Sequence, residues 1–204
     1  MIPLVVRLAA LALVLSACPA ETPFISFGRS DAPRAHVNDQ PVFLIGDSLL
    51  AGASDIGELS TKLADDGWIP EVDAVVGRST LSAIEVVSAR IEVPKDVVVV
   101  LGTNPSATLG NFPDEIRQLI DLLGERGAKR ILWIPPRHSD PAVYAERAGA
   151  LFATVDRRLH VPDWGAVIDQ LPELIGDDGL HLSGAGYERL ATFIADELLA
   201  LKTS

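Results

Sequence analysis

From residue 41 onward, short runs of β-branched and other apolar residues alternate with segments of helical periodicity. This alternation is typical of βαβ units, in which each helix returns the chain to the same edge of a parallel sheet. The predicted strands cover residues 42–45, 72–76, 97–101 and 131–134, with a weaker fifth at 159–161. The sequence therefore predicts an α/β fold: a flavodoxin-like three-layer α/β/α sandwich with a five-stranded parallel sheet.

Apolar residues at three- and four-residue spacing predict the helices between these strands. The helix after the first strand should have Gly52, Ile56, Leu59 and Leu63 on one face and should end at Gly67. A later helix should begin at Pro113 and Asp114 and align Ile116, Leu119, Ile120 and Leu123. The last helix aligns Tyr187, Leu190, Ile194, Leu198 and Leu201, and Ser183 is its predicted N-cap.

Composition limits the number of domains and the kinds of partner. With 204 residues, 48% of them hydrophobic, the chain is long enough for one globular domain with a substantial core. Its formal net charge is −11 at pH 7. Binding to a phosphate backbone needs clustered Lys and Arg, and the sequence shows no such cluster. We therefore expect no nucleic-acid partner.

The N-terminus has the pattern of an export signal. A single Arg7 precedes the apolar run at residues 8–15, and the small residues Ser16 and Ala17 precede Cys18. The string Leu-Ser-Ala-Cys resembles the bacterial lipobox, in which the cysteine is acylated and becomes the first residue after cleavage. This resemblance implies that residues 1–17 are a signal peptide and that Cys18, the single cysteine, is lipidated. A retained apolar anchor and an ordinary signal peptide are the alternatives.

Residues 18–40 separate this terminus from the predicted domain at residues 41–204. They contain prolines, Gly28, serines and charged residues without apolar periodicity, as expected for a tether. We therefore expect the mature protein to be an extracytoplasmic lipoprotein that is attached to the membrane through lipidated Cys18.

One serine stands at the turn from the first predicted strand into the first helix, in the string Ile45-Gly46-Asp47-Ser48-Leu49. A side chain at this turn lies at the carboxyl edge of a parallel sheet, where ligands bind. Free backbone N–H groups at the helix start can stabilise a developing anion there. The string alone is weak evidence, because Asp and Ser are also ordinary helix caps.

Three later strings also lie near predicted strand ends: Gly77, then Gly102-Thr103-Asn104, then Asp178-Gly179-Leu180-His181. With the Gly-Asp-Ser string, and in this order, they resemble the four blocks of the SGNH/GDSL hydrolase family. The resemblance covers roughly residues 41–201 and implies strand order 2-1-3-4-5. One departure is Pro105, which stands where the family often has Asp.

The resemblance implies a catalytic triad of Ser48, His181 and Asp178. A serine hydroxyl needs a base to take its proton, and the base works best when a carboxylate fixes its tautomer. Individually, Ser48 could be an N-cap, Asp178 a turn residue and His181 a surface imidazole. Asp177 could compete as the acid, but the family's Asp-x-x-His spacing selects Asp178. We expect Asp47 to be a cap or a support for the nucleophile turn.

The tetrahedral intermediate of acyl transfer needs donors aimed at its oxyanion. The expected donors are the backbone N–H groups of Ser48 and Gly77 and the side-chain amide of Asn104. Gly77 could instead form a simple turn, and Asn104 before Pro105 could start one. Arg78, Arg137 and His138 lie near the same edge as candidate substrate contacts.

No other residues indicate a different chemistry. We expect His36 to lie in the tether and His160 to be structural. His, Cys, Asp and Glu have no metal-ligand spacing, and neither a G-x-G-x-x-G nor a P-loop follows the first strand. No metal or other cofactor is expected.

The sequence thus predicts a serine esterase that hydrolyses small acyl esters, with O-acetyl esters as the first choice, through an acyl-enzyme. The expected substrate is a small acyl ester or an acylated glycan. Two alternatives stay open: an O-acyltransferase that acts on envelope glycans, and a non-catalytic lipoprotein that binds a glycan.

Overall fold

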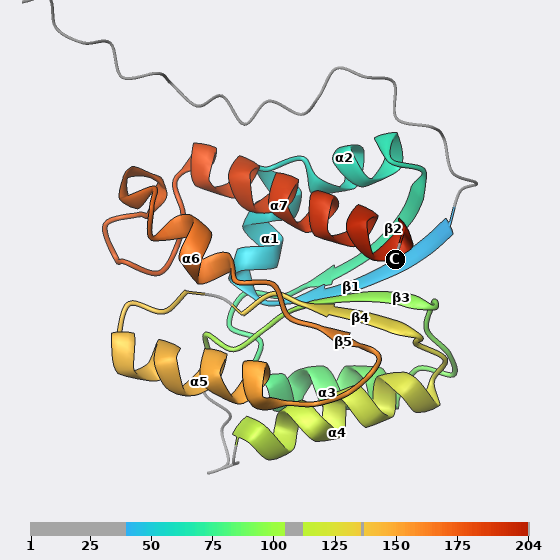
Figure 1. Ribbon diagram of the computed structural model, residues 1–204. Helices are drawn as coiled ribbons and strands as arrows, with labels where there is room; N and C mark the ends of the chain where they lie inside the picture. Colours follow the sequence, from blue (N-terminus) through green and yellow to red (C-terminus); the bar gives the residue numbers. More distant parts are fainter. Residues whose placement is uncertain (1–39, 105–111, 136, 204) are drawn as a thin grey trace, which may run out of the picture. The chain divides into compact units, whose positions relative to one another are not determined.

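The computed structural model describes residues 40–104, 112–135 and 137–203. A single sheet of five parallel strands lies at its centre (Figure 1). The strands are β1 (Gln40–Gly46), β2 (Trp68–Ala74), β3 (Asp96–Val100), β4 (Arg130–Trp133) and β5 (Leu159–His160). Their order across the sheet is β2-β1-β3-β4-β5. The predicted fold class and strand order are both confirmed.

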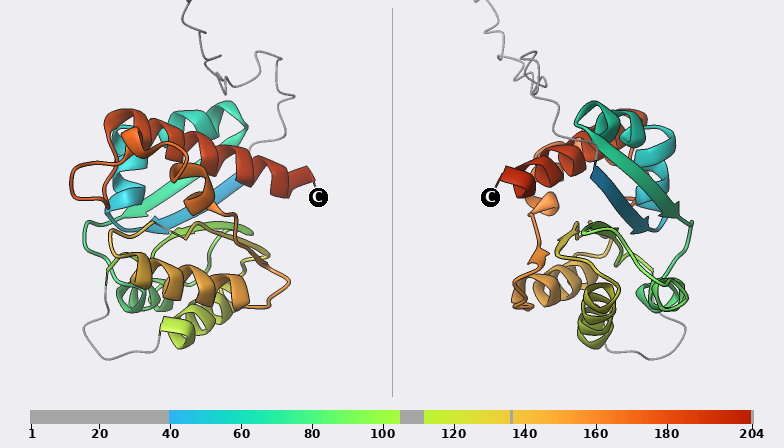
Figure 2. Two further views of the ribbon diagram at one scale, coloured as in Figure 1. Left: turned by 60° about the vertical axis from the view of Figure 1, so that its left-hand side comes forward. Right: turned by 90° about the vertical axis from the view of Figure 1, so that its right-hand side faces the viewer.

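Helices cover both faces of the sheet (Figure 2). One face carries α1 (Ser48–Asp55), α2 (Leu59–Asp65), α6 (Trp164–Ile168) and α7 (Gly184–Thr203). The other carries α3 (Thr80–Ser88), α4 (Phe112–Glu125) and α5 (Pro141–Ala153). A short 3₁₀ helix, η1 (Pro172–Leu174), precedes α7.

The inner strands supply a separate core to each face. Val42 and Leu44 of β1 pack among the helices of the first face, whereas Phe43 and Ile45 pack among those of the second. All four side chains are fully buried. A central strand that is buried on both faces has a continuous apolar run, which explains why these strands could be found from sequence.

The second strand differs from its prediction. The expected range was 72–76, but β2 covers Trp68–Ala74 because it pairs with β1 along that strand's whole length, from Gln40 opposite Trp68 to Gly46 opposite Ala74. Its half-buried edge position, with Pro70 tolerated there, gives no continuous apolar run. Val75 and Val76 lie beyond the strand and are 48% and 76% exposed.

The first helical stretch also differs from its prediction. We expected one helix, but the chain breaks between α1 and α2, where Ile56 is half exposed and Glu58 adopts a left-handed conformation with φ 55°. At this break Gly57 lies against α7: a Cβ on Gly57 would lie 2.4 Å from the carbonyl oxygen of Tyr187, so only glycine fits there. Gly67, with φ 77°, follows the end of α2 as predicted.

The other two predicted helices are confirmed. The four apolar residues assigned to one face of α4 are all buried, and Pro113 and Asp114 lie in its first turn. Ser183 caps α7, since its Oγ accepts a hydrogen bond from the Gly186 N–H at 3.2 Å. These helices position the site, because α7 begins directly after the string that contains His181.

Within the described ranges, no helix is both long enough and apolar enough to cross a bilayer. The predicted signal peptide, Cys18, His36 and the rest of the tether up to residue 39 lie outside the described residues, as does Pro105. Gln40, predicted as the last residue of the tether, is instead the first residue of β1, because it pairs with Trp68 of β2.

Candidate active site

Ser48 is placed by a tight turn between β1 and α1. Gly46 ends the strand, and a Cβ there would lie 2.5 Å from Leu50 Cβ and 2.8 Å from the Val100 carbonyl, so only glycine fits. Asp47 caps α1 by accepting a hydrogen bond from the Leu49 N–H at 3.0 Å. Ser48 is therefore the first residue of the helix, at the carboxyl edge of the sheet.

His181 and Asp178 come to this serine from 130 residues further along the chain. The Ser48 Oγ lies 3.0 Å from His181 Nε2, and His181 Nδ1 lies 2.6 Å from Asp178 Oδ2. These contacts fit the tautomer in which Nδ1–H donates to the carboxylate and Nε2 accepts from the hydroxyl. The structure thus brings all three predicted residues into one chain of hydrogen bonds.

Asp178 is held in its ionised form. The hydrogen bond to His181, followed by those from the backbone N–H groups of Leu180 and His181, lowers the pKa of Asp178 from 3.8 to about 2. Its Oδ1 accepts the two backbone bonds and its Oδ2 faces the imidazole. A carboxylate in this position fixes the ring orientation and can stabilise the imidazolium that forms during proton transfer.

The loop that carries both residues is tied to its surroundings. Gly176 N–H donates to the His181 carbonyl at 2.7 Å, and Ile175 pairs with Leu182 in an antiparallel bridge. From the loop after β4, Arg137 donates to the Gly179 carbonyl at 2.9 Å and to Asp169 at 2.7 Å. Arg137, predicted as a substrate contact, therefore also holds the peptide between Asp178 and His181.

Two predicted oxyanion donors are available at this edge. Gly77 has φ 80°, a conformation that favours glycine, and open space surrounds the position where a Cβ would stand. Among the described residues, no acceptor takes a hydrogen bond from the backbone N–H of Gly77 or of Ser48. Both groups are free to donate to a substrate oxygen.

The third predicted donor is already engaged. The amide nitrogen of Asn104 lies 3.1 Å from the Arg78 carbonyl, 3.0 Å from Thr103 Oγ1 and 3.5 Å from Asp47 Oδ2. An amide has two N–H groups, so one of these contacts must give way if Asn104 is to donate to an oxyanion.

Asp47 is the centre of this cluster. It is fully buried and accepts a 2.5 Å hydrogen bond from the Thr103 hydroxyl in addition to its capping bond. Burial raises the pKa of Asp47 above 3.8, against the opposing effect of the hydrogen bond from Thr103. The expected cap is confirmed. Asp47 also connects the nucleophile turn to the string that contains Asn104.

Sequence reasoning missed two supports of this cluster. Thr103 was noted only as part of its string, although its hydroxyl joins Asp47 to Asn104. Arg147 of α5 donates to the Gly102 carbonyl and lies over the ring of Phe112. Thr103 could have been found, because it is a polar residue directly beside Asn104. Arg147 lies 45 residues from Gly102, and no feature of the sequence connects the two.

The remaining candidates lie in different environments. The Arg78 guanidinium, predicted as a substrate contact, is buried and donates to Asp73 and, at 3.4 Å, to the Gly46 carbonyl, so it braces the ends of β1 and β2. His138 accepts a hydrogen bond from the Asp140 N–H at 3.0 Å. His160 pairs with Glu197 at 3.1 Å, as suits a structural histidine.

In the part of the chain that the structure describes, no group of three or more His, Cys, Asp and Glu side chains could hold a metal ion. The arrangement at the sheet edge is instead a hydroxyl in contact with a base, with unpartnered N–H groups nearby.

No protein-family model matches the sequence, and a search of curated proteins finds no match. Solved structures do match. The C-terminal catalytic domain of the Streptococcus pneumoniae peptidoglycan O-acetyltransferase A is 24% identical, with a TM-score of 0.68, over 82% of this chain and 97% of that domain. A lipase/acylhydrolase from Enterococcus faecalis is 21% identical, with a TM-score of 0.62, over 79% and 96%.

An acetyl xylan esterase from Geobacillus stearothermophilus is 17% identical, with a TM-score of 0.58, over 80% of this chain and 96% of that one. These neighbours are esterases and an acetyltransferase domain of the SGNH/GDSL type. At such identities the likeness is one of fold. This chain has the fold of the SGNH hydrolases, and the resemblance in the sequence is consistent with it.

Proposed function

We propose that this SGNH-fold protein is a serine esterase that removes small acyl groups, O-acetyl groups first among them, through an acyl-enzyme. The observation that carries the proposal is the continuous contact from Ser48 Oγ through His181 to Asp178, with distances of 3.0 Å and 2.6 Å. A hydroxyl in this arrangement is activated for attack on a carbonyl carbon.

The proposed reaction uses the triad and the two free N–H groups. Ser48 Oγ attacks the ester carbonyl while its proton passes to His181 Nε2, and the carbonyl oxygen becomes an oxyanion within reach of the free N–H groups of Ser48 and Gly77. His181 then gives the proton to the leaving alcohol. Water attacks the acyl-enzyme with the same base, and the carboxylic acid is released.

The choice of acetyl esters draws on the structural neighbours. One of them is named as a peptidoglycan O-acetyltransferase and another as an acetyl xylan esterase. In this protein the His181 and Asp178 side chains are 43% and 53% exposed, so a bulky alcohol part such as a glycan can approach them.

Transfer to a glycan hydroxyl is the second candidate. It is favoured by the likeness to the O-acetyltransferase domain, which has a TM-score of 0.68. Both reactions share the acyl-enzyme and differ only in the acceptor. An acceptor sugar that excludes water from the acyl-enzyme would turn hydrolysis into transfer.

The first experiment tests the nucleophile. A fluorophosphonate probe should label the full chain once, and Ser48→Ala should abolish labelling, because only a base-activated hydroxyl reacts quickly with such reagents. Ser183→Ala is a matched control, since Ser183 caps α7 and lies outside the triad. Equal labelling of wild type and Ser48→Ala would remove Ser48 from the mechanism, and no labelling at all would favour glycan binding alone.

The second experiment separates hydrolysis from transfer. The protein is incubated with 4-nitrophenyl acetate, with and without chito-oligosaccharide, and the products are identified by mass spectrometry. Acetate as the single product supports the esterase. An acetylated oligosaccharide that forms at the expense of acetate would favour the transferase instead.

We also propose that Cys18 is lipidated and anchors an extracytoplasmic enzyme to the membrane. The support is the apolar run followed by Ser16-Ala17-Cys18. The wild-type protein should partition into detergent after expression in a bacterial host, whereas Cys18→Ala should not be processed and acylated. An unmodified Cys18 in the mass of the mature protein would contradict this.

A further inference from the structure

The edge of the sheet opposite the candidate active site carries a concentration of positive charge. Three loops lead into β3, β4 and β5 at this amino edge: residues 89–95, 126–129 and 154–158. Together they contain six basic residues, namely Arg90, Lys95, Arg126, Lys129, Arg157 and Arg158, and only two acidic ones, Glu92 and Asp156. The whole chain has the reverse balance, with 17 basic and 28 acidic residues.

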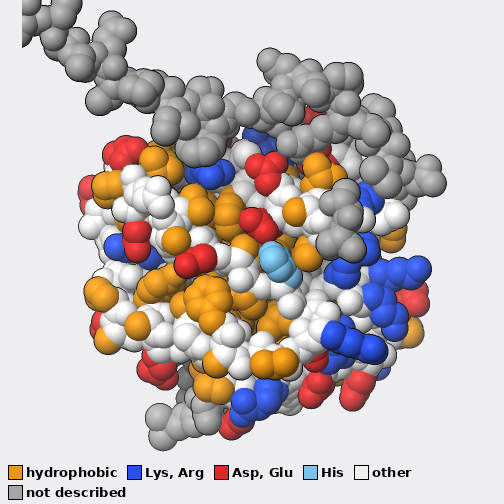
Figure 3. All heavy atoms as spheres, viewed as in Figure 1, with side chains coloured by type: hydrophobic (Ala, Val, Ile, Leu, Met, Phe, Trp, Pro, Cys, Tyr) orange, Lys and Arg blue, Asp and Glu red, His pale blue; other side chains and the backbone are white. Residues whose placement is uncertain are grey.

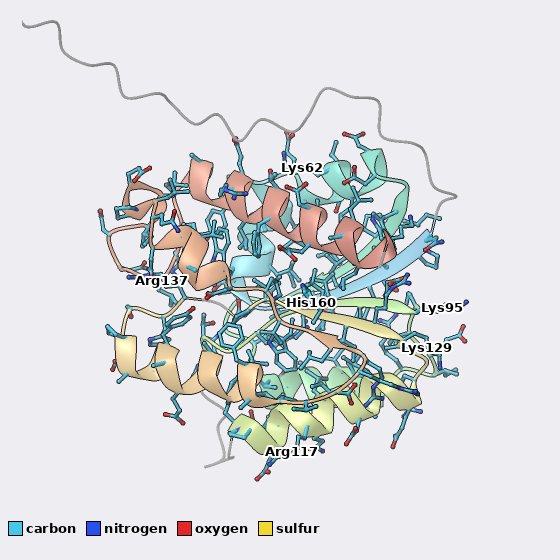
Figure 4. The ribbon with its side chains drawn as sticks, viewed as in Figure 1. Lys62, Lys95, Arg117, Lys129, Arg137 and His160 are labelled. Atoms are coloured by element: carbon cyan, nitrogen blue, oxygen red, sulfur yellow. The ribbon has the colours of Figure 1, made fainter. Side chains whose placement is uncertain are left out.

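The fold brings these side chains together. Lys and Arg side chains gather in Figure 3 on the side where β3 and β4 begin, and Figure 4 labels Lys95 and Lys129 there, on the side opposite Arg137. The loops are joined through their backbones, because the N–H groups of Lys129 and Arg130 both donate to the Lys95 carbonyl. Parallel pairing of all five strands makes this edge a single surface.

Three of the six cations have neither a salt bridge nor a side-chain hydrogen bond to another described residue. Arg90 pairs with Glu71, Arg158 pairs with Asp156 and Asp121, and Arg126 donates to the Ser88 carbonyl. In contrast, no salt bridge or side-chain hydrogen bond to another described residue holds Lys95, Lys129 or Arg157, and all three are exposed. Exposed acids also lie at this edge: Glu92 in the first loop, Glu125 at the end of α4 and Asp65 before β2.

The same loops expose apolar side chains. Ile91 is 93% exposed and Val155 is 99% exposed, the two largest values among the exposed large hydrophobic residues of the described chain. Ile91 lies between Arg90 and Glu92, and Val155 lies two residues before Arg157. Isolated apolar tips among cations are the features that insert into the headgroup region of a bilayer.

The chain's N-terminal segment joins the domain at this edge. Gln40, the first described residue, pairs with Trp68 at the start of β2, and two residues later Val42 pairs with Asp96 at the start of β3. Ser48 lies beyond the other end of β1. The first described residue therefore lies at the amino edge, and the active site lies at the opposite edge.

We propose that the amino edge rests on an anionic lipid surface, with Lys95, Lys129 and Arg157 facing the headgroups and with Ile91 and Val155 entering them. The triad then faces away from the membrane, toward substrates in the surrounding envelope. The tether keeps the domain near the bilayer, and the edge determines which side faces it. This inference concerns docking and does not depend on which acyl acceptor the enzyme uses.

Binding of the full chain to lipid vesicles tests whether the cations of the amino edge attract anionic lipid. Vesicles of phosphatidylcholine with 30 mol% phosphatidylglycerol, taken as a typical anionic mixture, are compared with phosphatidylcholine alone. Lys95→Glu/Lys129→Glu should reduce the partition coefficient on anionic vesicles about tenfold or more, and the difference should vanish on neutral vesicles and at high salt. Because both proteins share residues 1–39, their difference reports on the edge.

A matched control is Lys62→Glu/Arg117→Glu, which changes the net charge equally on α2 and α4 (Figure 4). It should bind anionic vesicles within about twofold of wild type. Equal losses for the two double variants would reduce the effect to net charge and overturn the proposal, as would wild-type binding by Lys95→Glu/Lys129→Glu. Both double variants should keep wild-type turnover of 4-nitrophenyl acetate, so a failure of docking is distinct from a failure of catalysis.

The apolar tips are tested separately. Ile91→Ser/Val155→Ser should weaken binding to anionic vesicles several-fold, whereas Val76→Ser, which alters an exposed valine at the opposite edge, should not. Wild-type binding by the double variant, or an equal loss in Val76→Ser, would contradict the proposed orientation.

Discussion

The two edges of the sheet have loops of opposite character. At the carboxyl edge, hydrogen bonds to partners from other elements fix Ser48, Asn104 and His181, and Asp178 bonds His181 within their shared loop. At the amino edge, Lys95, Lys129 and Arg157 project without such partners among the described residues. Chemistry needs side chains held in one geometry, whereas attraction to a charged surface needs only charge density. This difference is why we propose reaction at one edge and membrane contact at the other.

The largest loss of activity is expected from a substitution of Asp178 at the carboxyl edge. Asp178→Asn removes the charge that fixes and stabilises His181, so we expect kcat/KM for 4-nitrophenyl acetate to fall roughly 10³- to 10⁴-fold. Asp177→Asn is the matched control, because Asp177 is exposed and lies outside the chain of hydrogen bonds. A larger loss in Asp177→Asn would reassign the acid.

The next largest effect is expected at Asn104. If its amide turns from Thr103 to the oxyanion as charge develops, Asn104→Ala should lower kcat about 10²- to 10³-fold, or about 3 to 4 kcal/mol, and leave KM nearly unchanged. Steady-state kinetics measures the two constants. A variant that keeps most of its kcat would show that Asn104 stays bonded to Arg78 and Thr103, with Ser48 and Gly77 as the oxyanion donors.

Substitutions of Arg137 distinguish two roles for this residue: contact with the substrate and positioning of the catalytic loop. Since its guanidinium bonds the Gly179 carbonyl, Arg137→Ala should loosen the loop of Asp178 and His181 and lower kcat roughly tenfold, with little change in KM. Arg137→Lys should recover part of the loss, because a lysine can reach one of the two partners. A rise in KM at constant kcat would instead make Arg137 a substrate contact, as the sequence suggested.

The smallest effect concerns stability at Asp47. Because burial raises the pKa of Asp47, this group favours the folded state when protonated, and that contribution is lost as the pH rises through the folded pKa. Asp47→Asn stays neutral and keeps an acceptor for Leu49. The Tm of the variant relative to wild type should therefore rise by about a few degrees from pH 4 to pH 7. If the Tm of Asp47→Asn relative to wild type fell as the pH rises, burial would not raise the pKa of Asp47.

Much of the fold could be predicted from the sequence wherever a local hydrophobic pattern corresponds to a single kind of burial. The buried run of β3 and the apolar face of α4 needed no knowledge of their neighbours. Prediction failed where distant elements meet: β2 pairs along the whole length of β1, and Gly57 at the helix break lies against Tyr187 of α7.

The same division holds at the site. The sequence by itself supplied the triad candidates, because four strings in order resemble the blocks of the SGNH/GDSL family, although each of the three residues alone had an ordinary structural alternative. Only the tertiary structure showed that Arg78 bonds the Gly46 carbonyl and Arg137 the Gly179 carbonyl, since a long side chain reaches residues far along the chain. The sequence also shows an acidic protein, yet parallel strand pairing collects its cations at one edge. The distribution of charge over the surface depends on which loops lie at the same edge of the sheet, and no local sequence pattern predicts that.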